Sequence, residues 1–148
     1  ACDPDGIFLS NGPGDPKDLP EVIENIKKLI GKKPIFGICL GHQLMALANG
    51  ADTYKMKFGH RGINQPVKYL ATGRIYISAQ NHGYAVDEKS LEGKGINISH
   101  ISMNDGTIEG LEYTKHPPFT VQYHPEACPG PGDHDYLFKH FVDMMEGR

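Results

Sequence analysis

The first fifty residues alternate between short apolar runs and apolar stripes at helical spacing. Each apolar run is bounded by turn-forming or charged residues, which indicates a buried strand, and each is followed by a stripe that indicates an amphipathic helix. The predicted strands and helices, in chain order, are residues 6–10, 18–30, 34–38 and 40–48. We expect Asp18 and Glu21 to form a capping box at the start of the first helix. This order predicts parallel strands.

From about residue 56 to residue 113 the pattern changes to strands without helices. A strand at 119–123 and a C-terminal helix at 136–145 follow. The alternating segments are residues 67–69, 75–78, 96–102 and 108–112, separated by Gly73, Gly83, Gly93 and the turn at 104–106. We therefore predict an α/β fold, with a mainly parallel sheet flanked by helices and an additional antiparallel strand region. With no shift in composition, residues 1–148 are expected to form a single domain.

Cys39 stands where the second predicted strand runs into its helix, with Gly37 and Gly41 two residues to either side. Such glycines allow a sharp bend without a Cβ clash, and the bend pushes a nucleophile clear of the sheet. The helix N-terminus also favours the thiolate form of Cys39. A cysteine after a strand is often only a packing residue, so this pentapeptide by itself leaves both interpretations open.

A second candidate site lies far along the chain, at His124 and Glu126. His124 ends the strand at 119–123, and Pro125 stiffens the chain so that both side chains can project on the same side. A cysteine nucleophile needs a base, and the base needs a group that fixes its tautomer. Cys39, His124 and Glu126 supply these three roles at strand ends, where the active sites of α/β sheets gather.

The turn Gly12-Pro13-Gly14 has two interpretations. It lacks the spacing of a dinucleotide-binding loop, and no Walker lysine follows, so nucleotide binding is not expected. Its backbone amides could instead join that of Leu40 in an oxyanion hole, because the turn follows a neighbouring parallel strand. A plain tight turn needs the same glycines, and the sequence leaves the choice open.

Composition narrows the classes of function. The net charge of −3 shows no excess of positive charge of the kind that binds nucleic acid. No apolar run approaches the length of a membrane-spanning helix, so we expect neither nucleic acid nor a membrane as a partner. Three cysteines without paired spacing argue against a disulfide framework and for a reducing, cytoplasmic location. The eight histidines show no metal-binding spacing, so we expect no metal and no cofactor on this chain.

Six blocks of the sequence resemble signatures of one family. Three of them resemble class I, triad-type glutamine amidotransferases, and three look like the small, glutamine-hydrolysing subunit of carbamoyl phosphate synthetase. The first three blocks are residues 10–16, 37–43 and 124–126, and the second three are residues 57–67, 80–86 and 125–131. The resemblance covers essentially the whole chain.

The resemblance implies roles for particular residues. Cys39 would attack the carboxamide of glutamine and form a thioester, with His124 as the base and Glu126 holding His124. The amides of Gly12 and Leu40 would form the oxyanion hole. The residues that would hold the α-amino and α-carboxylate groups of glutamine are Gly14, Gln43, Asn81, Gly83 and Tyr84. The other histidines, His42, His60, His82 and His134, match no catalytic role and are expected to be structural.

The resemblance also implies a partner and a longer protein. Ammonia would pass to a large synthetase subunit, which alone would bind ATP, bicarbonate and Mg²⁺. The family's domain begins with a strand and helix before the segment that matches Ala1, so we expect a truncated chain with impaired glutaminase activity and self-association through the bared sheet. Two alternatives remain: another triad amidotransferase, serving anthranilate or GMP synthesis, and a non-catalytic interaction module.

Overall fold

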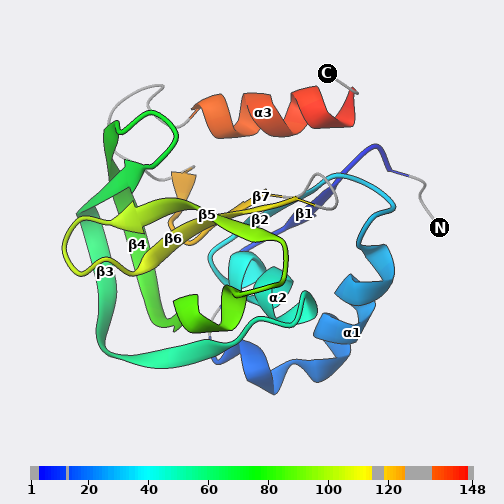
Figure 1. Cartoon of the computed structure of the whole chain (residues 1–148), viewed down its shortest axis with the longest axis horizontal. Coiled ribbons are helices and arrows are strands. Elements are labelled where there is room, and N and C mark those ends of the chain that lie inside the picture. Colours follow the sequence, from blue (N-terminus) through cyan, green and yellow to red (C-terminus); the bar gives the residue numbers. More distant parts are fainter. Residues whose placement is uncertain (1–3, 13, 115–118, 126–134, 147–148) are drawn as a thin grey trace.

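The computed structural model describes residues 4–12, 14–114, 119–125 and 135–146. Strands and helices alternate at first and give way to a run of strands, as the hydrophobic pattern predicts (Figure 1). In chain order the elements are β1 (Ile7–Leu9), the 3₁₀ turn η1 (Pro16–Asp18), α1 (Pro20–Leu29), β2 (Ile35–Ile38), α2 (Leu40–Ala48), β3 (Thr53–Tyr69), β4 (Ile75–Val86), the 3₁₀ turn η2 (Glu88–Leu91), β5 (Ile96–Ser102), β6 (Ile108–Tyr113), β7 (Phe119–Val121) and α3 (Asp135–Met145).

The strands form one seven-stranded sheet in the order β1-β2-β7-β6-β5-β3-β4. The predicted α/β class and the additional antiparallel region are confirmed. The expectation of a mainly parallel sheet needs correction, because only the β1–β2 and β2–β7 pairings are parallel, whereas β7–β6, β6–β5, β5–β3 and β3–β4 are antiparallel. The physical reason is that the short turns between β3 and β4 and between β5 and β6 can join only antiparallel neighbours, since parallel ones need a long crossover.

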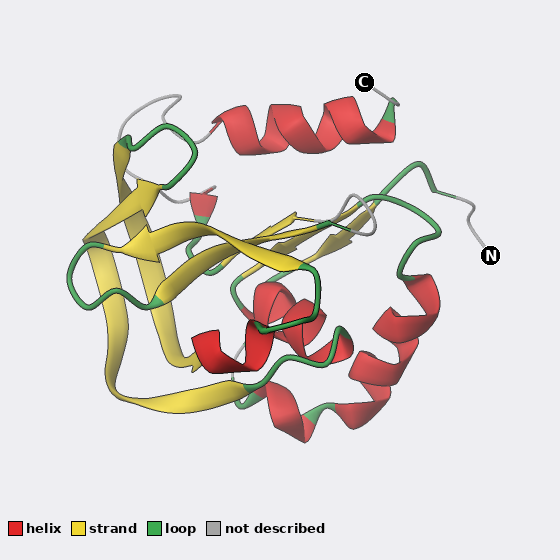
Figure 2. Ribbon diagram, in the orientation of Figure 1, coloured by secondary structure: helices red, strands yellow, loops and turns green. Residues whose placement is uncertain are grey.

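Helices cover both faces of the parallel part of the sheet. Figures 1 and 2 show α1 and α2 on one side and α3 on the other. Successive residues of β2 serve the two faces in turn, as a strand buried on both sides requires. Ile35 packs in the cluster on the α2 side, and Phe36 packs in the cluster on the α3 side.

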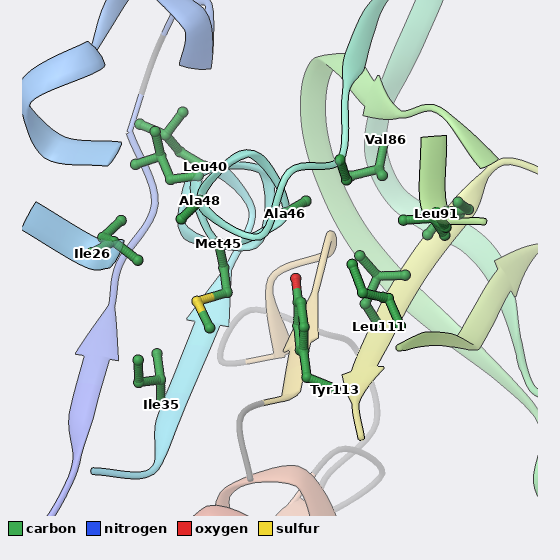
Figure 3. Close-up of a cluster of buried hydrophobic side chains, with 14 residues drawn as sticks. Ile26, Ile35, Leu40, Met45, Ala46, Ala48, Val86, Leu91, Leu111 and Tyr113 are labelled. Atoms are coloured by element: carbon green, nitrogen blue, oxygen red, sulfur yellow. The ribbon is translucent and has the colours of Figure 1, made fainter. Parts of the chain in front are cut away.

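The cluster on the α2 side joins the first two helices to the sheet. Figure 3 shows Ile26 of α1, Met45 of α2 and Ile35 of β2 within it, together with Tyr113 at the end of β6. Met45 has no exposed surface, and Ile26 and Ile35 are almost fully buried. Burial of such side chains stabilises the fold by about 1.5–3 kcal/mol each and anchors α2 against β2.

Aromatic rings hold α3 on the opposite face. The ring centroid of Phe36 lies 4.6 Å from that of Phe119 and 5.6 Å from those of Phe138 and Phe141. The Phe36 and Phe138 rings meet edge to face, an arrangement that aromatic quadrupoles favour. The C-terminal helix predicted from the sequence is therefore confirmed, and it packs against β2 and β7.

The first helix begins later than predicted. Asp18 lies in η1, which is capped by the side chain of Asp15, and α1 starts at Pro20 with no side-chain cap. The predicted capping box of Asp18 and Glu21 is therefore wrong. Proline disfavours helical geometry in the residue before it, and this places the helix start at the proline itself.

The fourth strand is longer than predicted. Gly83 was expected to lie in a turn, but β4 continues through it to Val86 because the ladder with β3 pairs Asn81 with Arg61 and Tyr84 with Lys55. Gly59 on β3 has a φ of +71° next to a register shift in this ladder. A Cβ there would lie 2.6 Å from the carbonyl oxygen of His82, so only glycine lets the two strands approach.

The strand β1 lies at one edge of the sheet, and its Phe8 is 47 % exposed. An open strand edge with exposed apolar surface is the feature on which self-association would depend. Association through this edge stays a prediction. No helix in the described ranges combines the length and the apolar character that crossing a membrane requires.

His42 lies on α2 with no exposed surface, between the helix and the sheet. Its Nδ1 is 2.8 Å from Oγ1 of Thr120 on β7. Burial, with smaller effects from His82 and His100, lowers the pKa of His42 to about 3. The unfolded chain therefore takes up a proton at His42 near pH 6.5, while the folded chain does not.

We expect His42 to make the fold acid-sensitive. Its contribution to stability is complete above pH 6.5 and declines as the pH falls toward 3, with a loss of about 1 kcal/mol between pH 7.5 and pH 5.5. Denaturant titration at both pH values should show this loss in the parent chain and a smaller one in His42→Gln. The exposed His140 supplies the control, His140→Gln. Equal pH dependence in all three proteins would contradict the assignment to His42.

Candidate active site

The carboxyl ends of three parallel strands meet at one edge of the sheet. The register pairs Leu9 with Gly37 and Ile38 with Val121, so β1, β2 and β7 end at the same level. The chain that follows each strand therefore emerges at the same place. These following segments contain Gly12, Cys39 and His124.

The backbone of Cys39 is strained. Its φ of 52° and ψ of −106° make it the one residue other than glycine with positive φ in the described part of the chain. Such conformations cost of order 1–3 kcal/mol and persist only where the surroundings enforce them. Here the amide of Cys39 donates to the carbonyl oxygen of Val121 at 2.9 Å, and its own carbonyl accepts from the amide of Gln43 at 3.2 Å.

The two glycines that frame Cys39 are required by close approach of the backbone. A Cβ on Gly37 would lie 2.9 Å from the carbonyl carbon of Gly41, and a Cβ on Gly41 would overlap the carbonyl oxygen of Leu9. Neither obstacle is a flexible side chain. The first turn of α2 therefore sits directly on β1 and β2, and this contact forces the sharp bend at Cys39 that the sequence predicts.

One pocket of about 550 Å³ opens at this edge of the sheet. Every predicted site residue that the structure describes lines it: Cys39, His124, Gly12, Leu40, Gly14, Gln43, Asn81, Gly83 and Tyr84. Glu126, the third member of the predicted triad, lies outside the described residues. The pocket joins the two parts of the sheet, because β4 carries Asn81, Gly83 and Tyr84.

Cys39 and His124 both face this pocket. The Cys39 residue is only 4 % exposed, and its Sγ lies 3.9 Å from the carbonyl oxygen of Asn81. His124 is half-buried, and its amide donates to the carbonyl oxygen of Ala79 at 2.8 Å. Contacts to β4 thus fix both the thiol and the backbone that carries the imidazole.

The side chain of Gln43 is buried and held in one orientation. Its Nε2 donates to the carbonyl oxygen of Tyr84 and to Oε1 of Gln122, both at 2.8 Å. Since both amide hydrogens are in use, what Gln43 can offer a ligand is the acceptor Oε1. That atom suits an ammonium or amide donor.

Sequence reasoning missed two cationic residues of this pocket, Lys55 and Arg61, and gave a third lining residue, His82, only a structural role. Both cations are exposed and come from β3, and no Asp or Glu is found among the described lining residues. The pocket therefore attracts a carboxylate. Only the β3–β4 register, which no local motif encodes, brings these cations to the site.

His82 lines the pocket but is almost fully buried. Burial, opposed by a bond to the carbonyl of Tyr84, lowers the pKa of His82 to about 4, so this imidazole is neutral at physiological pH. On the next strand His60 differs, since its contact with Glu109, opposed by burial and aided by Asp105, raises the pKa of His60 to about 9. The expectation that both are structural is not tested by these contacts.

The strained Cys39 on a strand–helix turn shares one pocket with His124, an arrangement that suits a thiol nucleophile with a histidine base. The sequence of residues 1–144 matches the family model described as Glutamine amidotransferase class-I, and the chain therefore belongs to this family. This confirms the family resemblance found in the sequence.

Curated relatives of high sequence identity are small chains of carbamoyl phosphate synthase. The chain is 63% identical over 148 residues to a carbamoyl phosphate synthase small chain of Listeria monocytogenes, and 64% identical over 143 residues to that of Bacillus cereus. These alignments cover 100% and 97% of this chain but 41% and 39% of the relatives. The chain thus spans about two fifths of the length of the relatives it matches.

Solved structures share the fold at low sequence identity. The glutaminase domain of a Trypanosoma brucei CTPS, solved with bound acivicin, aligns with a TM-score of 0.73 and 17% identity over 97% of this chain and 72% of that one. A glutamine amidotransferase from Thermotoga maritima aligns with a TM-score of 0.65 and 20% identity over 95% and 64%. At such identities the likeness supports the fold alone.

The contact of Gly41 with Leu9 gives a test of the bend. Alanine has a helix propensity about 1 kcal/mol better than glycine, so propensity alone would make Gly41→Ala stabilising. We expect a loss of about 2 kcal/mol in denaturant unfolding instead, because the new methyl group overlaps backbone.

The control for this prediction is Gly83→Ala. Its φ is not positive, and the nearest atom to a new Cβ is an Arg61 nitrogen at 3.7 Å. That variant should stay within about 1 kcal/mol of the parent. A Gly41→Ala protein as stable as the parent would show that the close approach does not exist.

Proposed function

We propose that this chain hydrolyses glutamine to glutamate and ammonia through a cysteine thioester, as the glutaminase part of a carbamoyl phosphate synthase. The observation that carries the proposal is the single pocket in which Cys39 and His124 meet the described residues expected to bind glutamine. The identity of 63% to a carbamoyl phosphate synthase small chain supports the particular synthase.

In the first half of the reaction, His124 accepts the proton of the Cys39 thiol, and the sulfur attacks the side-chain carboxamide carbon of glutamine. The tetrahedral intermediate collapses when His124 returns a proton to the nitrogen and the C–N bond breaks. Ammonia leaves, and a γ-glutamyl thioester remains on Cys39. A histidine base of this kind contributes typically about 10²–10⁴-fold to the rate.

The oxyanion of the intermediate needs donors that are already in place. Leu40 is the first residue of α2, and the first amides of a helix have no partner within the helix. Together with the amide of Gly12, which lines the same pocket, it is the proposed oxyanion hole. Loss of one such donor costs about 3–4 kcal/mol of transition-state stabilisation.

In the second half, His124 takes a proton from water, which attacks the thioester carbon. Collapse of this intermediate breaks the C–S bond, and Cys39 regains its proton as glutamate departs. Glu126 is the proposed partner that holds the tautomer of His124. The chain's own residues thus complete the cycle without a cofactor.

The pocket offers complementary groups for the two charged ends of an amino acid. The Oε1 atom of Gln43 is an acceptor that fits the α-ammonium group, since both hydrogens of that amide are already used. Arg61 and Lys55 supply positive charge for the α-carboxylate. Gly14, Asn81, Gly83 and Tyr84 complete the proposed binding surface.

The proposed destination of the ammonia is a large synthetase subunit, in the cytoplasm, where carbamoyl phosphate for arginine and pyrimidine synthesis would form. ATP, bicarbonate and Mg²⁺ would bind that partner. The rival assignments, glutaminase of an anthranilate or GMP synthesis enzyme, are disfavoured by the names of the relatives at 63–64% identity. Co-purification with a large synthetase subunit would separate these alternatives.

The nucleophile can be tested with a glutamine-mimicking electrophile, such as a diazo-oxo amino acid. We expect the adduct at Cys39 by peptide mass spectrometry, protection by glutamine, and labelling at least about 100-fold slower in His124→Asn. Cys2→Ser and Cys128→Ser are the matched controls and should label normally. Adducts spread equally over all three cysteines, or none at all, would favour a non-catalytic interaction module.

The carboxylate recognition can be tested through the same labelling. In Arg61→Gln the glutamine concentration that halves the labelling rate should rise about tenfold, because a charged hydrogen bond is worth about 1.5–3 kcal/mol. The electrophile carries the same α-carboxylate, so the rate without glutamine is compared at saturating electrophile, where it should change less if the nucleophile is intact. Lys57→Gln, on the same strand but outside the pocket lining, is the control. Equal protection in both variants would remove Arg61 from the binding site.

A further inference from the structure

Behind the pocket lies a buried cluster that the proposed reaction does not use. His60 on β3, His82 on β4 and Glu109 on β6 each offer a ligand atom, and these atoms all lie within 4.8 Å of one another. The two histidines are 6 % exposed, and Glu109 has no exposed surface. Three such groups packed together without water need a partner for every polar atom.

The neutral ring of His82 has one hydrogen to donate but faces two hydrogen-bond acceptors. Its Nδ1 lies 2.8 Å from the carbonyl oxygen of Tyr84, and its Nε2 lies 2.8 Å from Oε1 of Gln80. Both neighbours are acceptors, whereas a neutral imidazole carries one N–H. The carbonyl of Tyr84 can only accept, so the hydrogen belongs on Nδ1. The lone pair on Nε2 then points at another oxygen.

Exchanging the oxygen and nitrogen of the Gln80 amide would not relieve this contact between two acceptors, because it would create another one at Ser78. In the present orientation Nε2 of Gln80 donates to Oγ of Ser78 at 2.9 Å, and that hydroxyl donates to the carbonyl of Gln65 at 2.7 Å. After rotation Oε1 of Gln80 would face Ser78, whose single hydrogen is already committed. Either orientation leaves one acceptor facing another.

The same imbalance extends to His60 and Glu109. Oδ2 of Asp105 lies 2.7 Å from Nε2 of His60, so that nitrogen carries a hydrogen. Its Nδ1 points inward, 3.0 Å from Oε1 of Gln80 and 3.1 Å from Oε1 of Glu109. Oε1 of Glu109 pairs with His60 at this distance without the alignment of a hydrogen bond, and Oε2 has no aligned hydrogen-bond partner among the described residues. Asp105 and Glu109 on its two sides favour a His60 ring with a hydrogen on Nδ1 as well, whereas Nε2 of His82, Oε1 of Gln80 and the carboxylate of Glu109 are inward-facing acceptors.

We propose that His60, His82 and Glu109 bind a divalent transition-metal cation, with the side-chain oxygen of Gln80 as a fourth ligand. A cation among these atoms, taking the place of the Nδ1 proton of His60, satisfies every inward-facing lone pair at once. The outward nitrogens are already held, His60 by the carboxylate of Asp105 and His82 by the carbonyl of Tyr84. Metal-ligating histidines are usually oriented by such carboxylate and carbonyl partners.

The spacing fits a small cation. Zinc bound at about 2.0–2.1 Å in a tetrahedron separates its ligand atoms by about 3.4 Å. The contacts of Nδ1 of His60 and Nε2 of His82 with Gln80 and Glu109 are 2.8–3.1 Å, so these atoms need to part by only a few tenths of an ångström. The other ligand pairs lie within 4.8 Å and need to approach by about 1.4 Å at most. Two imidazoles and a carboxylate are ligands that zinc accepts, and we use Zn²⁺ as the probe.

This site departs from the sequence-based expectation that the chain binds no metal. Its ligands are separated by 22 and 27 residues along the chain, so no short motif contains them. They meet because β3 folds back on β4, which pairs His60 with His82. The site also touches the pocket, since the carbonyl of Tyr84 accepts from both His82 and Gln43.

The test is calorimetric titration of the metal-free chain with Zn²⁺. Cys2, Cys39 and Cys128 are all replaced by serine, so that no thiolate can bind the metal. We expect one equivalent of tightly bound zinc and a higher melting temperature with it. Cobalt in place of zinc should give the visible absorption bands of a four-coordinate site with nitrogen and oxygen ligands.

Variants locate the binding. In Glu109→Gln, which keeps the shape of the side chain, zinc affinity should fall at least about 100-fold, and in Asp105→Asn about 10–100-fold. Glu112→Gln, on the same strand, and His124→Asn, in the pocket, should bind zinc as the parent does. The melting temperature without metal shows that each variant is folded.

Three results would overturn the proposal. One is a folded, thiol-free chain that binds no zinc, which would mean that protonation alone satisfies the acceptor atoms of the cluster. Another is zinc affinity that Glu109→Gln and Glu112→Gln alter equally, which would place the metal elsewhere. Loss of binding in His124→Asn alone would likewise assign the zinc to the pocket and not to this cluster.

Discussion

The contact between the start of α2 and the ends of β1 and β2 governs the geometry of the site. Gly41 rests against the backbone of Leu9, and Gly37 leaves room for Gly41 in turn. Because the helix sits this close, the chain must turn within one residue, and Cys39 takes a backbone conformation that side chains rarely adopt. The apolar cluster around Met45 and Ile35 keeps the helix there. Packing in the core is thus what sets the position of the sulfur.

The two parts of the sheet contribute different things to the pocket. The parallel part supplies Cys39 and His124 at its carboxyl edge, and the antiparallel part supplies the wall formed by β4 and the cations from β3. Among the contacts that join the two parts is the carbonyl oxygen of Tyr84, which accepts from Gln43 of α2 and from His82 of β4. A displacement of β4 would therefore move the acceptor of Gln43 and the lining of the pocket together.

The local features of the site could be predicted from the sequence, and the long-range ones could not. The bend at Cys39 follows from an apolar run, two glycines and a helical stripe within a dozen residues, and the structure contains it. The continuation of β4 through Gly83 depends on its ladder with β3, where Gly59 permits an approach that no propensity reports. The same ladder brings Arg61 to the pocket. The parallel strands were overestimated because the direction of β6 beside β7 has no signature in either strand.

The conformation of Cys39 has a consequence for how this sequence can change over time. A residue other than glycine at φ 52° and ψ −106° raises the free energy of the folded chain, and glycine at this position would lower it. Selection for stability alone would therefore favour glycine over this cysteine if nothing required its sulfur. At this position, selection for stability favours glycine, whereas selection for a reactive thiol favours cysteine. A related protein that no longer needed the thiol would be expected to have glycine here and the same buried core.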